Sequence, residues 1–258
     1  MNIKLWFTFF IGFTCAICVG QNPNPNPALN VIILDEMVNE RLPGVSTLIV
    51  KDGEIVWIES FGNANLAQAD LVDDSTIFLL ASISKVFTAT AAFQLMEDGQ
   101  LNLDRDINQY LPFSVEVPGY ESDSITMRHL LTHTSGIEDN GPVQDTYYST
   151  GDPTISLADV CQRYFATNGS DYDASGNFFN RAPGTGYDYS NMAIALAGFV
   201  LESLSGIDFN QYCKQTIFNP LCMNNTSWYL SGLDVAKSRL IVRELWQIKI
   251  VLDRKSVV

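Results

Sequence analysis

The pattern of apolar and polar residues predicts a helix and then a pair of strands in the first third of the chain. Apolar residues recur at helical spacing over 28–40, and Pro43 and Gly44 end that pattern. The run VSTLIVKDGEIVWIESFG predicts two strands around Asp52 and Gly53, because Asp-Gly between apolar runs is typical of a two-residue hairpin turn. We therefore expect a helix followed by a β-hairpin.

Two later segments are apolar on nearly every face and predict buried helices. The first covers 82–98 and ends at Gly99, and the second covers 191–204 and ends at Gly206. Each segment begins at a cluster of polar residues. Because a helix N-terminus presents free N–H groups and the positive end of a dipole, chemistry is favoured at both starts.

Loop composition separates the two buried helices. Residues 138–184 are rich in Asp, Asn, Tyr, Ser and Gly, which favours turns. One amphipathic helix interrupts this stretch, with Ser156 as its cap and Asp159 at the third position. Before it, Thr126 is expected to cap a short helix.

Residues 1–20 predict a secretory signal peptide. Lys4 precedes an uncharged apolar run (5–19) of 15 residues, whereas a membrane span needs about 20 residues. Cleavage before Gln21 would expose a spacer, 21–27, whose alternating prolines favour an extended, solvated form. We expect export to the periplasm or the extracellular space, without a stable membrane span.

The charge balance narrows the class of protein. The 258 residues carry 15 basic and 29 acidic side chains, a net charge of −14. This argues against a nucleic-acid binder and against adhesion to anionic lipid, because both need a basic face. Residues 235–258 differ, since six basic and two acidic side chains give them a charge of +4. We interpret them as a tail of different origin, with a basic amphipathic helix as the alternative.

Three cysteines follow the predicted signal peptide, and an odd number cannot all pair within one chain. Cys161 shares helical spacing with Leu157 and Val160, which predicts a buried thiol. A disulfide between Cys213 and Cys222 is the open alternative for the other two.

The polar cluster at the first buried helix contains Ser82 and Lys85. Three residues apart on a helix, they share a face, with Cβ atoms about 5–6 Å apart. A lysine in an apolar pocket can take the proton of a serine hydroxyl and make it a nucleophile. The Ser82 N–H can also donate to an oxyanion. By itself, Ser-x-x-Lys occurs by chance in many proteins.

The second cluster contains Tyr189 and Asn191, which can project into a common cleft. A lysine cation stabilises a phenolate, so Tyr189 can serve as a general base beside Lys85. Asn191 can hold a substrate carbonyl or orient Lys85. A core tyrosine beside a helix cap is the alternative explanation of this motif.

His129 and His133 are four residues apart, a spacing that on a helix suits a metal ion. The sequence lacks the His-Glu-x-x-His pattern and a third ligand near them, so we interpret both as structural capping residues. We expect no metal site.

Five segments in order over residues 28–230 resemble the serine β-lactamase and penicillin-binding-protein superfamily, in its class C-like branch. They are PGVSTLIVKDGEIVW, LLASISKVFTATAAFQLMEDGQLNLDRDINQYLP, ITMRHLLTHTSGI, APGTGYDYSNMAIALAGFVLESLSG and FNQYCKQTIFNPLCMNNTS. The resemblance implies an α+β fold with an antiparallel sheet flanked by helices. It also implies a helical lobe from about residue 100 to 210.

The resemblance also implies a role for each candidate side chain. Ser82 corresponds to the acylated nucleophile, Lys85 to the lysine that helps activate it, and Tyr189 to the general base. Asn191 corresponds to the residue that contacts substrate and Lys85. The implied activity is that of an exported serine hydrolase acting on β-lactams, D-amino-acid peptides or related amides and esters. No cofactor is implied, and the partner is a small-molecule or peptidoglycan-like peptide substrate.

The chain departs from the family at two points. Cys222 stands where the family has glycine, and the family's Lys-Thr-Gly or His-x-Gly strand has no counterpart in the sequence. That strand supplies an oxyanion donor, whose loss costs about 10²–10³ in rate. We therefore expect an incomplete domain over 28–234, truncated or frameshifted near residue 235. A carboxylesterase of the same fold and a catalytically inactive remnant are the alternatives.

Overall fold

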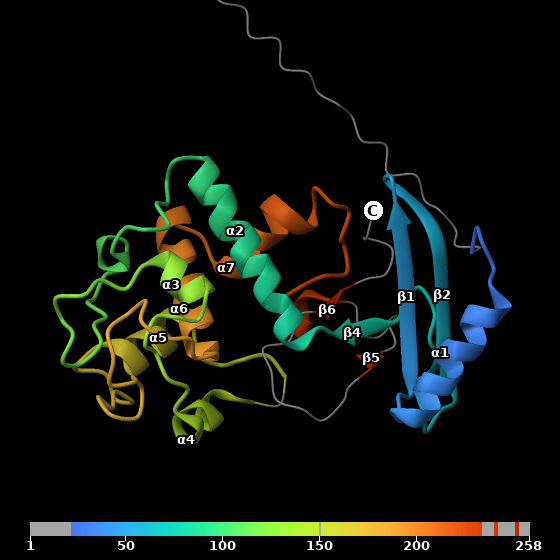
Figure 1. Ribbon diagram of the computed structural model, residues 1–258, viewed down its shortest axis with the longest axis horizontal. Helices are drawn as coiled ribbons and strands as arrows, with labels where there is room; N and C mark the ends of the chain where they lie inside the picture. Colours follow the sequence, from blue (N-terminus) through green and yellow to red (C-terminus); the bar gives the residue numbers. More distant parts are fainter. Residues whose placement is uncertain (1–21, 150, 234–239, 242–250, 253–258) are drawn as a thin grey trace, which may run out of the picture.

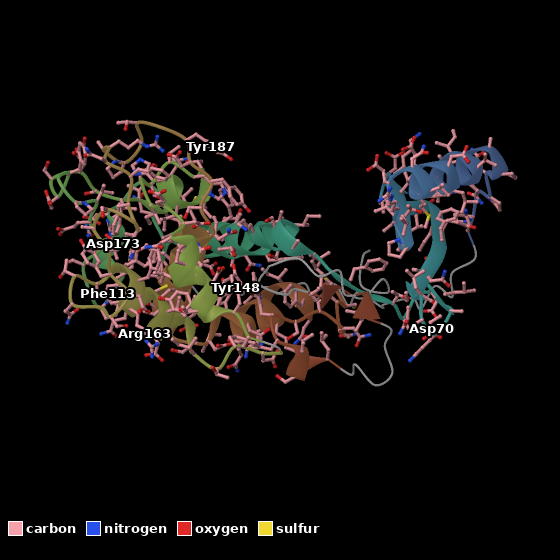
Figure 2. The ribbon with its side chains drawn as sticks, turned by 90° about the horizontal axis from the view of Figure 1, so that it is seen from below. Asp70, Phe113, Tyr148, Arg163, Asp173 and Tyr187 are labelled. Atoms are coloured by element: carbon pink, nitrogen blue, oxygen red, sulfur yellow. The ribbon has the colours of Figure 1, made fainter. Side chains whose placement is uncertain are left out.

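The computed structural model describes residues 22–149, 151–233, 240–241 and 251–252 (Figure 1). The predicted signal peptide and most of the predicted basic tail lie outside these residues. In the described part, a β-hairpin and one helix form one end of the molecule and a lobe of helices forms the other (Figure 1). Figure 2 shows the same separation from below, with Asp70 at the hairpin end and Phe113 in the lobe.

The hairpin forms where the sequence predicts it. β1 (Gly44–Lys51) pairs antiparallel with β2 (Glu54–Asn65). The connecting residues Asp52 and Gly53 have φ angles of 55° and 80°, the left-handed conformations that a tight hairpin turn needs. The short β3 (Asp70–Leu71) extends this sheet beyond β2, in the order β1-β2-β3.

The predicted first helix packs on one face of the hairpin. It is α1 (Pro27–Asn39), and the Asn26 side chain caps it by accepting from Leu29 N–H. Met37 of α1 and Trp57 and Phe61 of β2 make a small apolar cluster of their own. This cluster is separate from the core of the helical lobe.

The structure describes the predicted spacer over 22–27, where residues 23–27 are exposed, Asn22 is half-buried and two asparagines contact β2. Asn22 Nδ2 donates to Glu59 Oε2 at 2.8 Å, and Asn24 Nδ2 donates to the Val56 carbonyl at 2.7 Å. The spacer is therefore tied to the hairpin by two side-chain hydrogen bonds.

A second small sheet lies between the hairpin and the lobe (Figure 1). Its central strand β4 (Ile77–Leu79) pairs in parallel with β5 (Leu240–Ile241) and antiparallel with β6 (Val251–Leu252). The described residues thus form two three-stranded sheets, and those that belong to the predicted tail are strands rather than a helix. Shortly after β4, the chain reaches the candidate nucleophile Ser82.

The lobe is built around α6 (Asn191–Ser205), nine of whose residues are buried. Packed near it are α2 (Lys85–Glu97), α3 (Met127–Leu131), α5 (Leu157–Phe165) and α7 (Phe209–Cys213). Shorter helical segments are η1 (Ala81–Ser84), η2 (Ile107–Gln109), α4 (Gly141–Gln144), η3 (Asp145–Tyr147), the π-turn η4 (Lys214–Phe218) and η5 (Leu230–Gly232). The capping predictions at Thr126 and Ser156 are confirmed, because both side chains accept the expected backbone N–H.

The prediction that 82–98 is buried on all sides is wrong. One face of α2 carries Thr88 and Leu95 into the core, but Val86 is 59 % exposed and Phe93 is 47 % exposed. The described residues cover α2 on the side toward α6, α7 and η4 and leave the face with Val86 and Phe93 open. The 82–98 segment also begins with the 3₁₀ turn η1 and becomes α-helical only at Lys85.

The three described cysteines are not joined in disulfides, so the Cys213–Cys222 bridge does not form in this structure. Cys161 is fully buried, as its spacing predicts, and burial raises its thiol pKa. Within the described residues, no helix by itself has the length and hydropathy to cross a membrane. Only α6 together with the segment Phe209–Phe218, bent by 76°, has that length and composition.

Candidate active site

The structure brings all four candidate side chains into one hydrogen-bonded cluster. Ser82 Oγ lies 2.7 Å from Tyr189 Oη and 3.3 Å from Lys85 Nζ. Lys85 Nζ also donates to Asn191 Oδ1 at 2.8 Å. The ammonium lies 5.0 Å from the centroid of the Tyr189 ring, so one cation faces both the serine and the tyrosine.

Local backbone geometry presents Ser82 to solvent. Ala81, the residue before it, has a φ of 53°, a left-handed conformation that costs a non-glycine residue of order 1 kcal/mol. This residue redirects the chain from β4 into η1, and Ser82 itself is exposed. Tyr189 is 44 % exposed, so a ligand can reach both hydroxyl groups.

Asp139 is a functional residue that sequence reasoning missed. Its carboxylate accepts from Ser190 Oγ at 2.8 Å, from the N–H and the Nδ2 of Asn191 at 2.9 Å each, and from Met192 N–H at 3.0 Å. These bonds hold the first turn of α6 and turn the Asn191 oxygen toward Lys85. A carboxylate at a helix N-terminus also suits the helix dipole.

Asp139 could not be found from spacing. It lies 52 residues before Asn191 in the sequence, and the residues just before it show no capping pattern. Only the folded chain places this carboxylate at the start of α6.

His133 organises the segment that carries Tyr189. His133 has a left-handed backbone conformation, with a φ of 56°. Its Nδ1 accepts from Ser190 N–H at 3.2 Å, and its carbonyl accepts from Asp188 N–H at 2.8 Å. The imidazole packs on the Tyr189 ring with centroids 4.5 Å apart. The interpretation of His133 as a cap at the C-terminus of the short helix after Thr126 is therefore wrong, because its side chain binds the N–H of Ser190, the N-cap residue of α6, and packs on Tyr189.

His129 acts locally at the start of α3. Its N–H donates to Thr126 Oγ1, and its Nδ1 accepts from Thr126 N–H at 3.4 Å, which together make a capping box. Both histidines therefore use a ring nitrogen to hold backbone. Among the described residues, neither histidine belongs to a group of three metal-ligating side chains.

We expect the stability of the protein to fall as the pH drops below about 6.5, the ordinary pKa of histidine. Burial, and then the Lys85 cation, lower the pKa of His133, while Asp139 raises it. The unfolded chain therefore takes up the proton more readily. The stabilising effect of neutral His133 is present above about pH 6.5 and is lost toward its lower folded-state pKa.

The measurement is the urea midpoint at pH 7.5 and pH 5.5 for the parent chain and for His133→Asn. Asparagine tolerates a left-handed φ and keeps an oxygen acceptor for Ser190 N–H, but it does not titrate. The variant should lose less stability on acidification than the parent chain does. An unchanged pH dependence would contradict this role, since His129 would then account for the effect.

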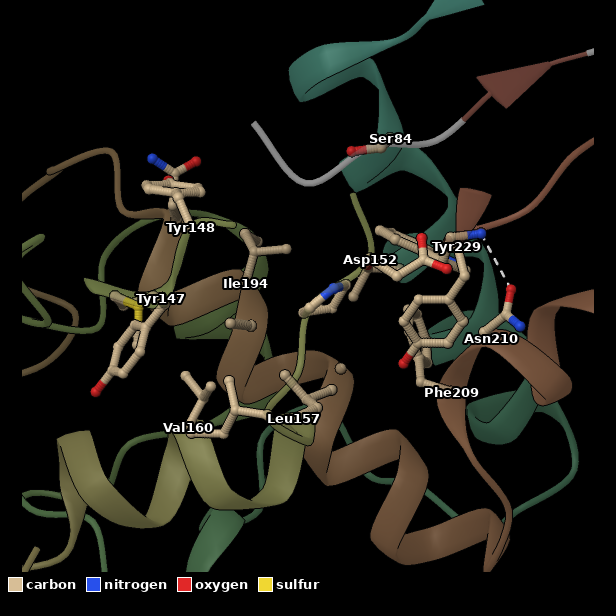
Figure 3. Close-up of a pocket in the computed structure, with 18 of the residues that line it drawn as sticks. Ser84, Tyr147, Tyr148, Asp152, Leu157, Val160, Ile194, Phe209, Asn210 and Tyr229 are labelled. Carbon is tan, nitrogen blue, oxygen red and sulfur yellow. Dashed lines mark hydrogen bonds between the residues drawn. The ribbon is translucent and has the colours of Figure 1, made fainter. Parts of the chain in front are cut away.

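A cavity of about 240 Å³ adjoins the cluster (Figure 3). Lys85 and Asn191 belong to its lining, and it continues between α5, α6 and the segment around Phe209. In Figure 3, Leu157, Val160 and Ile194 lie between Tyr148 on one side and Phe209 on the other. The reacting groups thus stand at the border of an apolar space.

Comparison with known proteins decides the family. The β-lactamase family model matches residues 31–239, which is most of the chain. The chain belongs to the β-lactamase family. The predicted membership of the serine β-lactamase and penicillin-binding-protein superfamily is confirmed, and so is the α+β fold.

Relatives of this β-lactamase-family chain include penicillin-binding proteins and a hydrolase with acyltransferase activity. Penicillin-binding protein 4* of Bacillus subtilis (strain 168) is 30 % identical over 185 residues, which are 71 % of this chain and 38 % of that protein. The octameric penicillin-binding protein homologue from Pyrococcus abyssi is 26 % identical with a TM-score of 0.68, over 90 % of this chain and 51 % of that one.

The structure described as EstCE1, a hydrolase with promiscuous acyltransferase activity, is also similar. It is 25 % identical with a TM-score of 0.66, over 87 % of this chain and 58 % of that one. The chain thus spans between 38 % and 58 % of the length of these three relatives. It has the fold of hydrolases related to penicillin-binding proteins, esterases and β-lactamases.

Proposed function

We propose that this protein is an exported serine hydrolase that works through an acyl-enzyme on Ser82. The observation that carries the proposal is the 2.7 Å contact between Ser82 Oγ and Tyr189 Oη, with Lys85 Nζ 3.3 Å from the same serine oxygen. This is a nucleophile in hydrogen-bond contact with a base, which a third group orients. Export rests on the predicted signal peptide over 1–20.

The reaction proceeds in two steps. Tyr189, beside the Lys85 cation, accepts the Ser82 proton as Oγ forms a bond to the substrate carbonyl carbon. The Ser82 N–H stabilises the oxyanion, and the C–N or C–O bond then breaks as the leaving group takes the proton. Water, deprotonated by the same base, attacks the ester and releases the acid and free Ser82.

The proposed substrate is an amide or ester. Its carbonyl can reach Ser82 and Tyr189, because both side chains are exposed. β-Lactams and D-amino-acid peptides of the peptidoglycan kind belong to this class. A carboxylesterase is the second candidate, favoured by the similarity to EstCE1 and by the apolar cavity beside Lys85.

The test is the intact mass of the chain after incubation with a fluorophosphonate, in parallel with Ser82→Ala. We expect one adduct on the parent chain and none on the variant. Ser84→Ala is the matched control, since Ser84 is buried and donates to the Ala81 carbonyl, and it should keep the adduct. A folded parent chain without an adduct would refute the proposal and favour an inactive protein.

Two chromogenic substrates separate the candidates once labelling succeeds. Turnover of nitrocefin indicates a lactamase, whereas turnover of a short-chain nitrophenyl ester alone indicates an esterase. Both measurements use the full chain.

A further inference from the structure

The cavity beside the cluster is an elongated groove along α6. Asn191, Ala195, Gly198 and Glu202 all line it and are spaced by four, three and four residues, which places them on one face of the helix. At a rise of 1.5 Å per residue, the eleven steps from Asn191 to Glu202 span about 16 Å. The groove therefore starts at the reacting groups and leads away from them.

The walls of this groove are apolar and its floor is made of small residues. Side chains from four separate segments form the walls, namely Ile155, Leu157, Val160, Ile194, Phe209 and Trp228. On the floor, a Cβ added at Gly198 would lie in ordinary contact, 3.4 Å from Leu157 and 3.7 Å from Phe209. The width of the groove thus depends on the small size of Ala195 and Gly198.

The charged groups of the lining are Lys85 at the near end and the carboxyl groups of Asp152 and Glu202 farther along. Lys85 is engaged with Ser82 and Asn191. Asp152 accepts from the N–H groups of Leu230 and Ser231, and Glu202 accepts from Phe209 N–H at 3.0 Å. Among the residues that the structure describes, no positively charged side chain lines the far end. A ligand carboxylate placed there would lose its hydration without gaining a positive partner.

We propose that this groove binds the acyl chain of the substrate and selects an uncharged, medium-length chain over a short or carboxylate-ended one. The inference rests on the proposed acyl-enzyme at Ser82, because Lys85 and Asn191 belong both to that cluster and to the groove lining. Each methylene that enters the groove leaves water for an apolar wall, which stabilises the bound state.

The first test compares three nitrophenyl esters on the unaltered full chain: the acetate, the octanoate, and the monoester of suberic acid. The last two share eight carbons and differ in the terminal carboxylate. We expect kcat/KM for the octanoate to exceed that for the acetate at least tenfold. The suberate monoester should fall at least tenfold below the octanoate.

The second test fills the groove by Ala195→Leu. The octanoate preference should fall at least tenfold, while kcat/KM for the acetate stays within about twofold. Ala67→Leu, at an exposed turn of the hairpin unit, is the matched control and should change neither value. If Ala195→Leu does not fold, Val160→Thr of nearly equal volume places a hydroxyl in the same wall and should lower octanoate turnover alone.

The outcomes separate this inference from the function on which it rests. Acetate turnover and fluorophosphonate labelling without an octanoate preference would overturn the inference and leave the proposed function intact. Equal rates for octanoate and suberate monoester would also overturn it. A folded chain with neither labelling nor turnover of any ester would overturn both.

Discussion

Replacing Lys85 by alanine should lower kcat/KM for a short-chain nitrophenyl ester by about 10³-fold while the chain stays folded. Lys85 is the one side chain of the cluster that contacts the other three. It donates to Ser82 Oγ and Asn191 Oδ1, and its ammonium faces the Tyr189 ring at 5.0 Å. Without Lys85, Ser82 loses a hydrogen-bond donor and the Tyr189 ring loses the cation that faces it.

Two variants make this expectation specific. Lys85→Arg keeps the positive charge but replaces a compact ammonium by a planar guanidinium that does not give up its proton, so activity should remain low. Lys51→Ala removes an exposed lysine at the end of β1 and should leave activity unchanged. Thermal unfolding of each variant separates lost chemistry from lost fold. Activity of Lys85→Ala within tenfold of the parent would contradict the assigned role.

Replacing Asp139 by alanine should reduce the free energy of unfolding by about 2–4 kcal/mol and kcat/KM by about 10–100-fold. The carboxylate accepts four hydrogen bonds at the start of α6, from Ser190, Asn191 and Met192. Its loss leaves partly buried donors without an acceptor. It also frees the Asn191 amide to rotate away from Lys85.

Asp159→Ala is the matched control for Asp139. Asp159 also lies in the first turn of a helix, but it is exposed and its carboxylate accepts from Ser156 Oγ alone. That variant should cost less than about 1 kcal/mol and leave activity unchanged. Asp139→Asn should be intermediate, because it keeps the shape but turns a donor toward other donors. Urea unfolding and ester kinetics measure both effects, and equal losses for Asp139→Ala and Asp159→Ala would contradict the positioning role.

Elements with a local cause could be predicted from the sequence. The hairpin follows from Asp52 and Gly53, and the starts of α3 and α5 follow from Thr126 and Ser156, because turns and caps involve residues a few positions apart. The pairing of Ser82 with Lys85 is of the same kind. The contact of these two residues with Tyr189 and Asn191 could be predicted only through the resemblance to a family, because more than 100 residues separate the two motifs.

Contacts between distant segments could not be predicted in this way. An apolar pattern predicts that a helix has a buried side, but it does not say which neighbour covers that side. Val86 and Phe93 are therefore exposed although the sequence of α2 favours burial. The groove along α6 depends on residues of three separate helices, because Gly198 of α6 faces Leu157 of α5 and Phe209 of α7.

The sequence by itself thus determined the local elements, the two candidate motifs and, through resemblance, the superfamily. The tertiary structure alone decided that Asp139 and His133 hold the segment that carries Tyr189 and Asn191, and that an apolar groove leads away from Lys85. The physical reason is the separation along the chain over which each kind of interaction acts. Capping, turn formation and helical periodicity act over a few residues, whereas hydrogen bonds across 50 residues and the shape of a cavity exist only once the helices have packed.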